Sequence, residues 1–523
     1  MIQKKAQDAT ATNGRVLLIS LQQDLTVIGL RYVHYSLLNA GYASHYLHLP
    51  RFKPENAGGA EQLRQFVADV DPSWVGISLM STEFNAARQL GAKLKRHFPH
   101  IPVVWGGVHP TIDPESCLAY ADYVCVGEGE GVAVQFSAAL ARGEDPRRVP
   151  GLCYLMDGVP TRNALAPLIE DLDTIPSYEH IPKNGFLQDG SGVISPLGQR
   201  QAIRYGRYQH KFYDVLTSRG CPFSCTYCCS DLVSHIQGSK KIRRRTVGHI
   251  IAELEQAVRE FPMIEMVNFH DENFLSHDIG FLEAFTAEYR ARVNRPFMFA
   301  CIPIYIKHDK MKLLKDAGLV WIRMGLQSGS DRVLRDVYKR KSFRQHFLAA
   351  AAVLDDLAIA AYCDVILDNP FESVEDQLET IRTLLAAPRP FYLQLYSLSA
   401  YFGSELHGRI LRECPEKLED PKEKDYLIYR KNRLNELTRL SAYIPRTWAR
   451  KMVEWYRENP GGWAFAASLP AAKLFSALCF EPVAHFRVFK RSQRGSYQQV
   501  LQALPAYGRI WLDRFYRQWT DAS

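Results

Sequence analysis

The first 140 residues alternate between short apolar runs and longer amphipathic stretches. The apolar runs that predict strands are 15–20, 44–49, 74–80, 102–107 and 123–129. Between them, hydrophobic residues recur at helical spacing, as in the stretch that ends at Gly41. Strands that alternate with helices form a parallel, doubly wound sheet, which binds ligands at the carboxyl ends of its strands.

The same alternation returns after residue 212. The expected strands are 212–220, 265–274, 297–305, 321–330, 361–370 and 391–400. Six β/α units predict a partial (β/α)6 barrel of the TIM type, with its active site at the carboxyl strand ends. The predicted fold class is therefore α/β, in four parts. These are a Rossmann-like sheet (1–140), a connector without clear periodicity (141–211), a partial barrel (212–410) and a helical region (411–523).

Composition is that of a soluble globular protein, with 47% hydrophobic and 23% charged residues. No run approaches the roughly 20 uninterrupted apolar residues of a membrane-spanning helix, and the best candidate, 463–480, contains Pro470 and Lys473. The apolar run near the N-terminus is too short for a secretory signal. Eleven scattered cysteines do not suggest a disulfide framework, so we expect a cytoplasmic protein.

Four cysteines crowd into nine residues directly after the first barrel strand. They are Cys221, Cys225, Cys228 and Cys229, and the first three are spaced C-x3-C-x2-C. Soft thiolate ligands suit iron–sulfur centres and zinc. A structural zinc site usually has a fourth ligand and paired C-x2-C spacings, and we find no second pair. Three ligands on a four-iron cube leave one iron open to substrate or cofactor. Zinc or inert structural cysteines are the alternative.

This motif resembles the signature of the radical SAM enzymes, C-x3-C-x2-C after the first strand of a partial barrel. The resemblance implies a [4Fe–4S] cluster on Cys221, Cys225 and Cys228, with S-adenosylmethionine (SAM) chelating the open iron. One electron then cleaves SAM to methionine and a 5′-deoxyadenosyl radical. Cys229 is expected to be a buried residue that does not bind the cluster.

Other barrel positions resemble the family residue by residue. The resemblance implies SAM contacts from Tyr227, Asp271, Asn273, Gln327, Ser328 and Asp368. Gln327 stands where the family commonly has Glu, which weakens any claim of a charge at this position. Arg245 and Glu253 match an Arg–Glu pair after the cluster loop. Each polar residue at a strand end could instead make only structural hydrogen bonds.

The N-terminal sheet before such a barrel resembles the cobalamin-binding subclass, over about 15–410. The resemblance implies corrinoid contacts from Thr26, Ser81, Thr82, Gly106, Gly107, His109, Gly127 and Glu128. Corrinoid methyltransferases carry D-x-H-x-x-G after the first strand, and Thr26 replaces that His. We therefore predict base-off cobalamin without a protein histidine below it. His109 as a substitute ligand, and a degenerate sheet that binds no corrinoid, are the alternatives.

The leading hypothesis is a cobalamin-dependent radical SAM enzyme that methylates an unactivated carbon of a small or lipid-like substrate. The same cofactors could instead serve cyclisation, carbon–carbon coupling or oxidation without methyl transfer. A non-catalytic iron–sulfur regulator is a hypothesis of another class. An enzyme of this type would need an external one-electron reductant such as flavodoxin or ferredoxin.

The C-terminal segment 441–523 is basic and aromatic. It has 12 Lys+Arg against 5 Asp+Glu, and five of the eight tryptophans. Three interpretations stay open: a helical cap with a solvated basic face, a patch on the inner membrane surface that would favour a lipid-like substrate, and, least favoured, a nucleic-acid surface. The basic run 240–245 is interpreted as an active-site rim.

Overall fold

A computed structural model describes residues 13–50, 52 and 57–492 of the 523-residue chain. The predictions for Trp511, Trp519 and the rest of 493–523 lie outside the described residues. The chain divides into two compact units. Unit 1 comprises Met1–Pro222, Tyr227–Asn268 and Ala400–Lys424, and unit 2 comprises Phe223–Thr226, Phe269–Ser399 and Asp425–Ser523.

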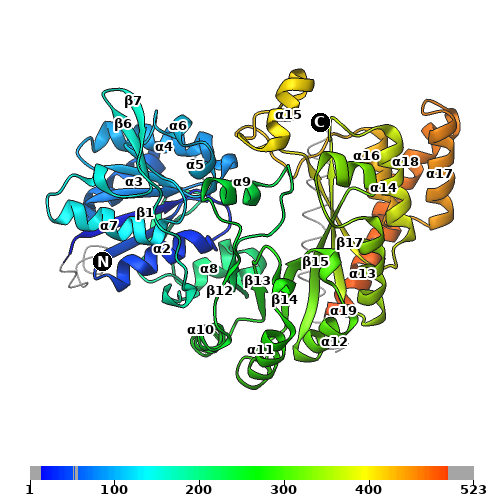
Figure 1. The fold of residues 1–523 in the computed structure, drawn as a ribbon, viewed down its shortest axis with the longest axis horizontal. Helices are drawn as coiled ribbons and strands as arrows, with labels where there is room; N and C mark the ends of the chain where they lie inside the picture. Colours follow the sequence, from blue (N-terminus) through cyan, green and yellow to red (C-terminus); the bar gives the residue numbers. More distant parts are fainter. Residues whose placement is uncertain (1–12, 51, 53–56, 493–523) are drawn as a thin grey trace. The chain divides into compact units, whose positions relative to one another are not determined.

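Unit 1 is built on a nine-stranded sheet with the order β7-β6-β5-β4-β3-β1-β2-β8-β9 (Figure 1). The five predicted strands are all present, as β1 (Arg15–Ser20), β2 (Ala43–His48), β3 (Trp74–Ser78), β4 (Val103–Gly106) and β5 (Tyr123–Cys125). They pair in parallel with the order 2-1-3-4-5, which confirms the doubly wound sheet. The strand order reverses between β1 and β3, and sheets of this order bind their ligand at that switch point.

The stretch 141–211, which we treated as a connector, adds four strands to this sheet. They are β6 (Leu152–Met156), β7 (Val159–Arg162), β8 (Gly185–Gln188) and β9 (Ile194–Pro196). β6 and β7 extend one edge as antiparallel strands, and β8 pairs with β2 on the other edge. These strands are short and β7 is largely exposed, and although β6 has the apolar run LCYLM, the stretch lacks the alternation of strands and helices that predicted the rest of the sheet.

Helices cover both faces of the first sheet (Figure 1). Alternate residues of a strand point to opposite faces, so β1 buries Val16 and Leu18 on one side and Leu17 and Ile19 on the other. The first side packs against α2 (Ile28–Asn39) and α7 (Gly129–Ala141), and the second against α3 (Ala57–Val70) and α4 (Phe84–His97). The other α-helices of this unit are α5 (Val108–Ile112), α6 (Pro114–Cys117), α8 (Gln199–Tyr205), α9 (Cys229–Ile236), α10 (Val247–Glu260) and α15 (Glu405–Glu413).

The second sheet contains the six predicted barrel strands in chain order. They are β10 (Phe212–Val215), β13 (Met266–Phe269), β14 (Phe297–Cys301), β15 (Leu319–Gln327), β16 (Ala360–Leu367) and β17 (Tyr392–Ser397). The last four lie in unit 2 and pair in parallel. The helices between the six strands are α9, α10, α11 (Ile279–Arg292), α12 (His308–Ala317), α13 (Arg344–Asp356) and α14 (Val374–Ala386). This is the β/α alternation of a partial barrel.

Among the described residues after 425, the chain is helical and has no strand. The elements are α16 (Arg433–Ser441), α17 (Arg446–Glu458), α18 (Trp463–Phe475), a π-turn η9 (Ser476–Phe480) and α19 (Glu481–Ser492). α14, α16, α17 and α18 share one apolar core. We expected no segment apolar enough to cross a membrane, but by length and mean hydropathy (1.4) the helical stretch Trp463–Val488 qualifies.

Candidate functional site

The loops expected to bind a ligand leave the first sheet at one edge. The register places Ser20 beside Ser78, and Ser78 beside Gly106, so the carboxyl ends of β1, β3 and β4 are level. Seven of the eight expected corrinoid residues follow these ends and that of β5, and Gly106 is itself the last residue of β4. The sheet thus brings together positions that are about 100 residues apart in sequence.

His109 is the most informative side chain at this edge. It is 1% exposed, and its Nδ1 lies 3.0 Å from the hydroxyl of buried Ser81. Burial lowers the pKa of His109 to about 4, so its ring is neutral at physiological pH. Its Nε2 is buried and has no hydrogen-bond partner. Because buried polar atoms are nearly always paired, this nitrogen fits a site that a ligand completes.

The other residues at the edge have local roles in the fold. The Thr26 backbone N–H donates to Asp24 at 3.0 Å, which shapes the loop after β1. Thr82 is exposed and donates its hydroxyl to Glu83 at 2.7 Å. Gly107 has φ +102°, and a Cβ there would lie 2.8 Å from the Leu79 carbonyl oxygen, so only glycine fits. Gly127, with φ +97°, donates its N–H to the hydroxyl of Thr111 at 3.1 Å.

Glu128 is already occupied by two guanidinium groups. Arg243 donates to both of its carboxylate oxygens, at 2.7 and 2.9 Å, and Arg219 donates to one at 3.0 Å. Arg219 also pairs with the neighbouring Glu130 at 2.5 Å. Burial opposes ionisation of Glu128, but the hydrogen bonds from Arg243 and the charge of Arg219 outweigh it and lower its pKa to about 2. Glu128, which we expected to contact the corrinoid, is thus an acidic member of a buried ion-pair network.

This network ties the flanks of the cysteine loop to the ligand edge of the first sheet. Arg219 ends β11 (Ser218–Arg219) and Arg243 begins β12 (Arg243–Arg244), which pair antiparallel, and the chain between them carries the four cysteines. Helix α9, which follows the cysteines directly, packs against α5, the helix that carries His109. β11, β12, α5 and α9 belong to unit 1, whereas the short segment Phe223–Thr226, which contains Cys225, is assigned to unit 2.

The basic run 240–245, which we interpret as an active-site rim, contains both buried and exposed side chains. Arg243 and Arg245 are buried, and Arg245 pairs with buried Glu253 at 2.5 Å. The predicted Arg245–Glu253 pair is therefore confirmed. Arg243 and Arg245 thus form internal ion pairs that hold β12 and α10, whereas Arg244 and Lys241 of the same run are exposed.

The cysteine loop offers thiols in two environments. Cys225 is buried, whereas Cys221, Cys228 and Cys229 are partly exposed, and none forms a disulfide. Cys228 caps the N-terminus of α9, where the helix dipole favours a thiolate. Among the described residues no three metal-binding side chains surround a single ion. A four-iron cube binds each cysteine through a different iron, so its ligands need not meet at one point, and three thiols suit it.

The strand ends of unit 2 carry strained and unpaired groups. Gln327 ends β15 with φ +66°, and Asp368 follows β16 with φ +60°; left-handed conformations of non-glycine residues cluster at functional sites. Asn273 is buried after β13 and accepts from the Ile302 N–H at 3.3 Å, but its Nδ2 has no partner. The buried Nδ2 of Asn369, after β16, is also unpaired. Asp271 is buried as well, and Tyr227 belongs to unit 1.

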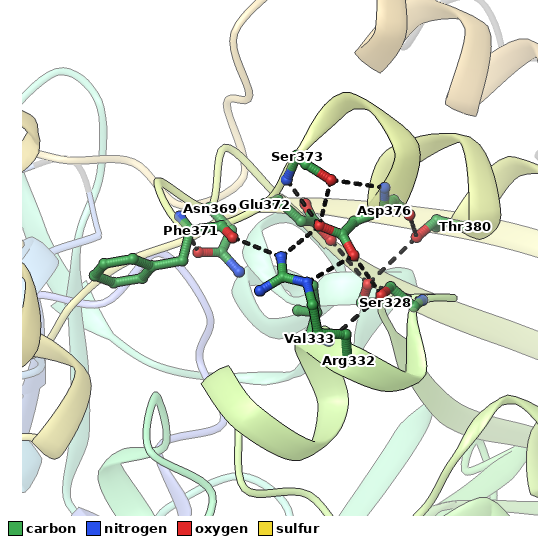
Figure 2. A network of polar contacts seen from close by, with 10 residues as sticks. Ser328, Arg332, Val333, Asn369, Phe371, Glu372, Ser373, Asp376 and Thr380 are labelled. Carbon is green, nitrogen blue, oxygen red and sulfur yellow. Dashed lines mark hydrogen bonds and ion pairs between the residues drawn. The ribbon is translucent and has the colours of Figure 1, made fainter.

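Ser328 belongs to a polar network that joins the loop after β15 to helix α14 (Figure 2). Its hydroxyl donates to Glu372 at 2.8 Å, and the neighbouring Gly329 N–H donates to the Thr380 hydroxyl at 2.7 Å. Arg332 pairs with Asp376 in the same network. Burial raises the pKa of Glu372 to about 7. A carboxyl group that can hold or lose a proton near neutral pH therefore lies beside Ser328.

Asp368 accepts three hydrogen bonds from within unit 2. The donors are the Ser397 hydroxyl at 2.7 Å, the Arg430 N–H at 3.0 Å and the Asn435 amide at 2.8 Å. This carboxylate therefore joins the end of β16 to the start of α16. Sequence analysis did not single out Arg219, Asn369 and Glu372. All three adjoin recognised motifs, but only the fold reveals their partners.

These observations define a class of protein: an α/β protein with a three-thiol metal-cluster loop tied to the ligand edge of a doubly wound sheet. Residues 14–137 match the B12 binding domain family, and residues 215–384 match the Radical SAM superfamily. The chain belongs to the radical SAM superfamily and carries a B12-binding domain before its radical SAM domain. Radical SAM domains use a [4Fe–4S] cluster and SAM, and B12-binding domains use cobalamin, so the two domains of this chain imply these three cofactors.

Known proteins resemble the chain over much of its length. An uncharacterized methyltransferase of Pyrococcus horikoshii is 26% identical over 325 residues, which cover 61% of this chain and 65% of the relative. The matched part is thus slightly under two thirds of that relative. The radical SAM methyltransferase TsrM of Kitasatospora setae shares the fold with a TM-score of 0.62, 17% identity and 76% of each chain. The cobalamin-dependent SAM radical enzyme OxsB does so with a TM-score of 0.66, 13% identity, and 95% and 81% of the two chains.

Proposed function

We propose that this enzyme methylates an unactivated carbon of a small or lipid-like substrate. The observation that carries the proposal is the ion-pair network of Glu128, which ties both flanks of the cluster loop to the corrinoid edge of the sheet. A carbon without a nucleophilic electron pair cannot take a methyl group from SAM directly, so its methylation uses both cofactors. The Pyrococcus relative and the Kitasatospora enzyme are both named methyltransferases, which supports this proposal.

The corrinoid would lie on the loops after β1, β3, β4 and β5. His109 fits this group because its Nε2 is a buried hydrogen-bonding atom that lacks a partner. Thr26 offers a hydroxyl, a poor cobalt ligand, so the lower face of the corrinoid would have no histidine from this loop. The other residues that we assign to the corrinoid are Ser81, Thr82, Gly106, Gly107 and Gly127. Glu128 acts instead by holding Arg219 and Arg243.

The cluster would be held by Cys221, Cys225 and Cys228, and SAM by polar groups at the barrel strand ends. Asn273 and Asn369 each present an unpaired buried amide donor, which suits a carboxylate of the bound molecule. Tyr227, Asp271, Gln327, Ser328 and Asp368 complete the SAM assignment. When bound, the cluster supplies the electron that cleaves SAM, and the corrinoid carries the methyl group.

The cysteines support a reducing compartment and hence a cytoplasmic enzyme. None of the eleven forms a disulfide, although several are partly exposed. Cluster chemistry of this kind needs single electrons from outside the chain, and we assign them to a flavodoxin or a ferredoxin.

Product mass tests the proposal. The reconstituted enzyme, with cobalamin, a reductant and SAM carrying a trideuterated methyl group, is incubated without oxygen with an extract of the host. A product heavier by one methylene that carries the label is expected, and Cys225→Ala should abolish it. A product that has only lost two hydrogens would overturn methyl transfer and indicate cyclisation or coupling.

A further inference from the structure

The helical stretch 463–488 presents a row of large apolar side chains to the outside. They are Trp463 (83% exposed), Leu478 (58%), Leu474 (54%), Phe475 (50%), Val483 (50%) and Phe486 (37%). Leu474 and Phe475 end α18, and Leu478 follows within the π-helical segment η9. Single exposed apolar residues are ordinary, but several gathered on one short stretch mark a binding surface. We call these six side chains the outer face.

The opposite face of the stretch packs against the rest of unit 2, and the charged residues of the stretch form ion pairs with helix α16. Phe465 and Ala472 are buried in the core shared with α14, α16 and α17, and Val488 is buried against the second sheet. Between Trp463 and Phe486 the only Asp, Glu, Lys or Arg residues are Lys473 and Glu481. Lys473 pairs with Glu436 of α16 at 3.0 Å, and Glu481 pairs with Arg439 of the same helix.

This arrangement decides between crossing a membrane and lying on one. The stretch is long enough to cross, but both of its ends are packed into unit 2, at Phe465 and at Val488. Crossing would strip out those contacts and would place the charged groups of Lys473 and Glu481 in hydrocarbon without their partners Glu436 and Arg439, which is costly. A helix held along one face and apolar along the other suits the plane of the lipid interface.

We propose that the outer face docks on the surface of an anionic lipid bilayer. Charge identifies the occupant: segment 441–523 has 12 basic and 5 acidic residues, so it is attracted to anionic headgroups and repelled by a second copy of itself. Trp463 and Phe475 are aromatic residues, and Trp in particular is favoured at the headgroup level. The inference does not depend on which reaction the enzyme catalyses.

Vesicle flotation of the full-length holoenzyme at low salt tests the proposal. We expect flotation with phosphatidylcholine vesicles that contain 30% phosphatidylglycerol, and much less with pure phosphatidylcholine. Leu474→Glu/Leu478→Glu should weaken binding by about tenfold or more, because each exposed leucine loses its burial in lipid. The matched control is Leu155→Glu/Val159→Glu, two exposed apolar residues of the β6–β7 hairpin, which should float like the wild type.

A second variant guards against misfolding. Trp463→Ser removes the most exposed side chain of the row, and a thermal melt checks that both variants stay folded. The proposal is overturned if the wild type stays at the bottom with both vesicles. It is also overturned if both folded variants float as well as the wild type, since the basic tail alone would then bind. A wild-type dimer that the leucine variant dissociates, without flotation, would assign the face to a second copy.

Discussion

At the scale of single residues, replacing the buried Glu128 should destabilise the protein more than its small change in size suggests. Replacing it with Gln leaves the buried guanidinium of Arg243 without its counter-charge, because Arg243 pairs with no other carboxylate in the ion pairs of the described residues. Removing one partner of a buried pair typically costs about 3–5 kcal/mol. We therefore expect Glu128→Gln to lower the unfolding free energy by a similar amount, measured by chemical denaturation.

A nearby exposed pair provides the control for this experiment. Glu170 pairs with Lys241 at 2.6 Å, but both side chains are more than 60% exposed, so Glu170→Gln should change the melt little. The pH dependence is a second signature. The pKa of Glu128 is lowered to about 2, so its contribution is full above its unfolded value of 4.5 and is lost as pH falls towards 2. Glu128→Gln should flatten the acid limb; an unchanged limb would contradict the network.

Glu372 predicts the opposite pH dependence. Burial raises its pKa from 4.5 to about 7, so its stabilising effect is full below pH 4.5 and is lost as pH rises through 7. The unfolding free energy of the wild type, relative to that of Glu372→Gln, should therefore fall between pH 5 and 8 by at most about 3 kcal/mol. The melting temperature of the wild type should fall with it. Exposed Glu375, in the first turn of helix α14 just after Glu372, offers the control, Glu375→Gln, which should follow the wild type. Parallel wild-type and Glu372→Gln curves would contradict the assignment.

What sequence could predict at this scale depends on how local the signal is. The three cysteines and the Arg245–Glu253 pair follow from spacing within one short segment. Glu128 and Asp368 were expected to contact cofactors. In the structure Glu128 pairs with Arg219 and Arg243, and Asp368 accepts from Asn435; these partners are 67–115 positions away in the sequence. No periodicity encodes a pairing of that range.

At the scale of elements, Gly329 sets how closely the loop after β15 approaches helix α14. A Cβ on Gly329 would lie 2.4 Å from the Thr380 Cα and 2.7 Å from the Glu379 carbonyl oxygen, and backbone atoms cannot yield as side chains do. Gly329→Ala should therefore push Ser328 away from Glu372 and destabilise the fold by at least about 1–3 kcal/mol. Gly248→Ala, in a helix with open space around it, should leave the melting temperature unchanged or raise it. Equal melts for the two variants would contradict this contact.

The strands were predictable where short apolar runs alternate with helical stretches along the chain. β1 was located to the residue because all but its first residue is buried, and all six barrel strands were found although most of them bury only alternate residues. β6–β9 were missed because hairpins at sheet edges are short and partly exposed, and they owe their place to pairing with β5 and β2. The limits of the four predicted parts remain a prediction.

At the scale of the whole molecule, two cofactor sites are assigned to different parts of the chain: the corrinoid to the loops of the first sheet and the cluster to the cysteine loop. His109 and Ser81 hold each other without any cysteine, so the corrinoid site does not depend on bound iron. Cobalamin at 100 times its Kd should stabilise the protein by about 2.7 kcal/mol, and the same shift should appear in the Cys221→Ala/Cys225→Ala/Cys228→Ala variant.

His109→Ala tests the converse, that the cluster site does not depend on bound cobalamin. It removes the unpaired buried nitrogen, so it should weaken hydroxocobalamin binding, read from retained visible absorbance, while about four irons per chain still assemble on the cysteines. Cys229→Ala should retain both cofactors, because Cys229 lies within α9 beyond the three-cysteine motif. If the triple cysteine variant also lost the corrinoid, each cofactor would be shaping the other's site. The ion pairs of Glu128 would then be the first contacts to examine, since they join the two loops within unit 1.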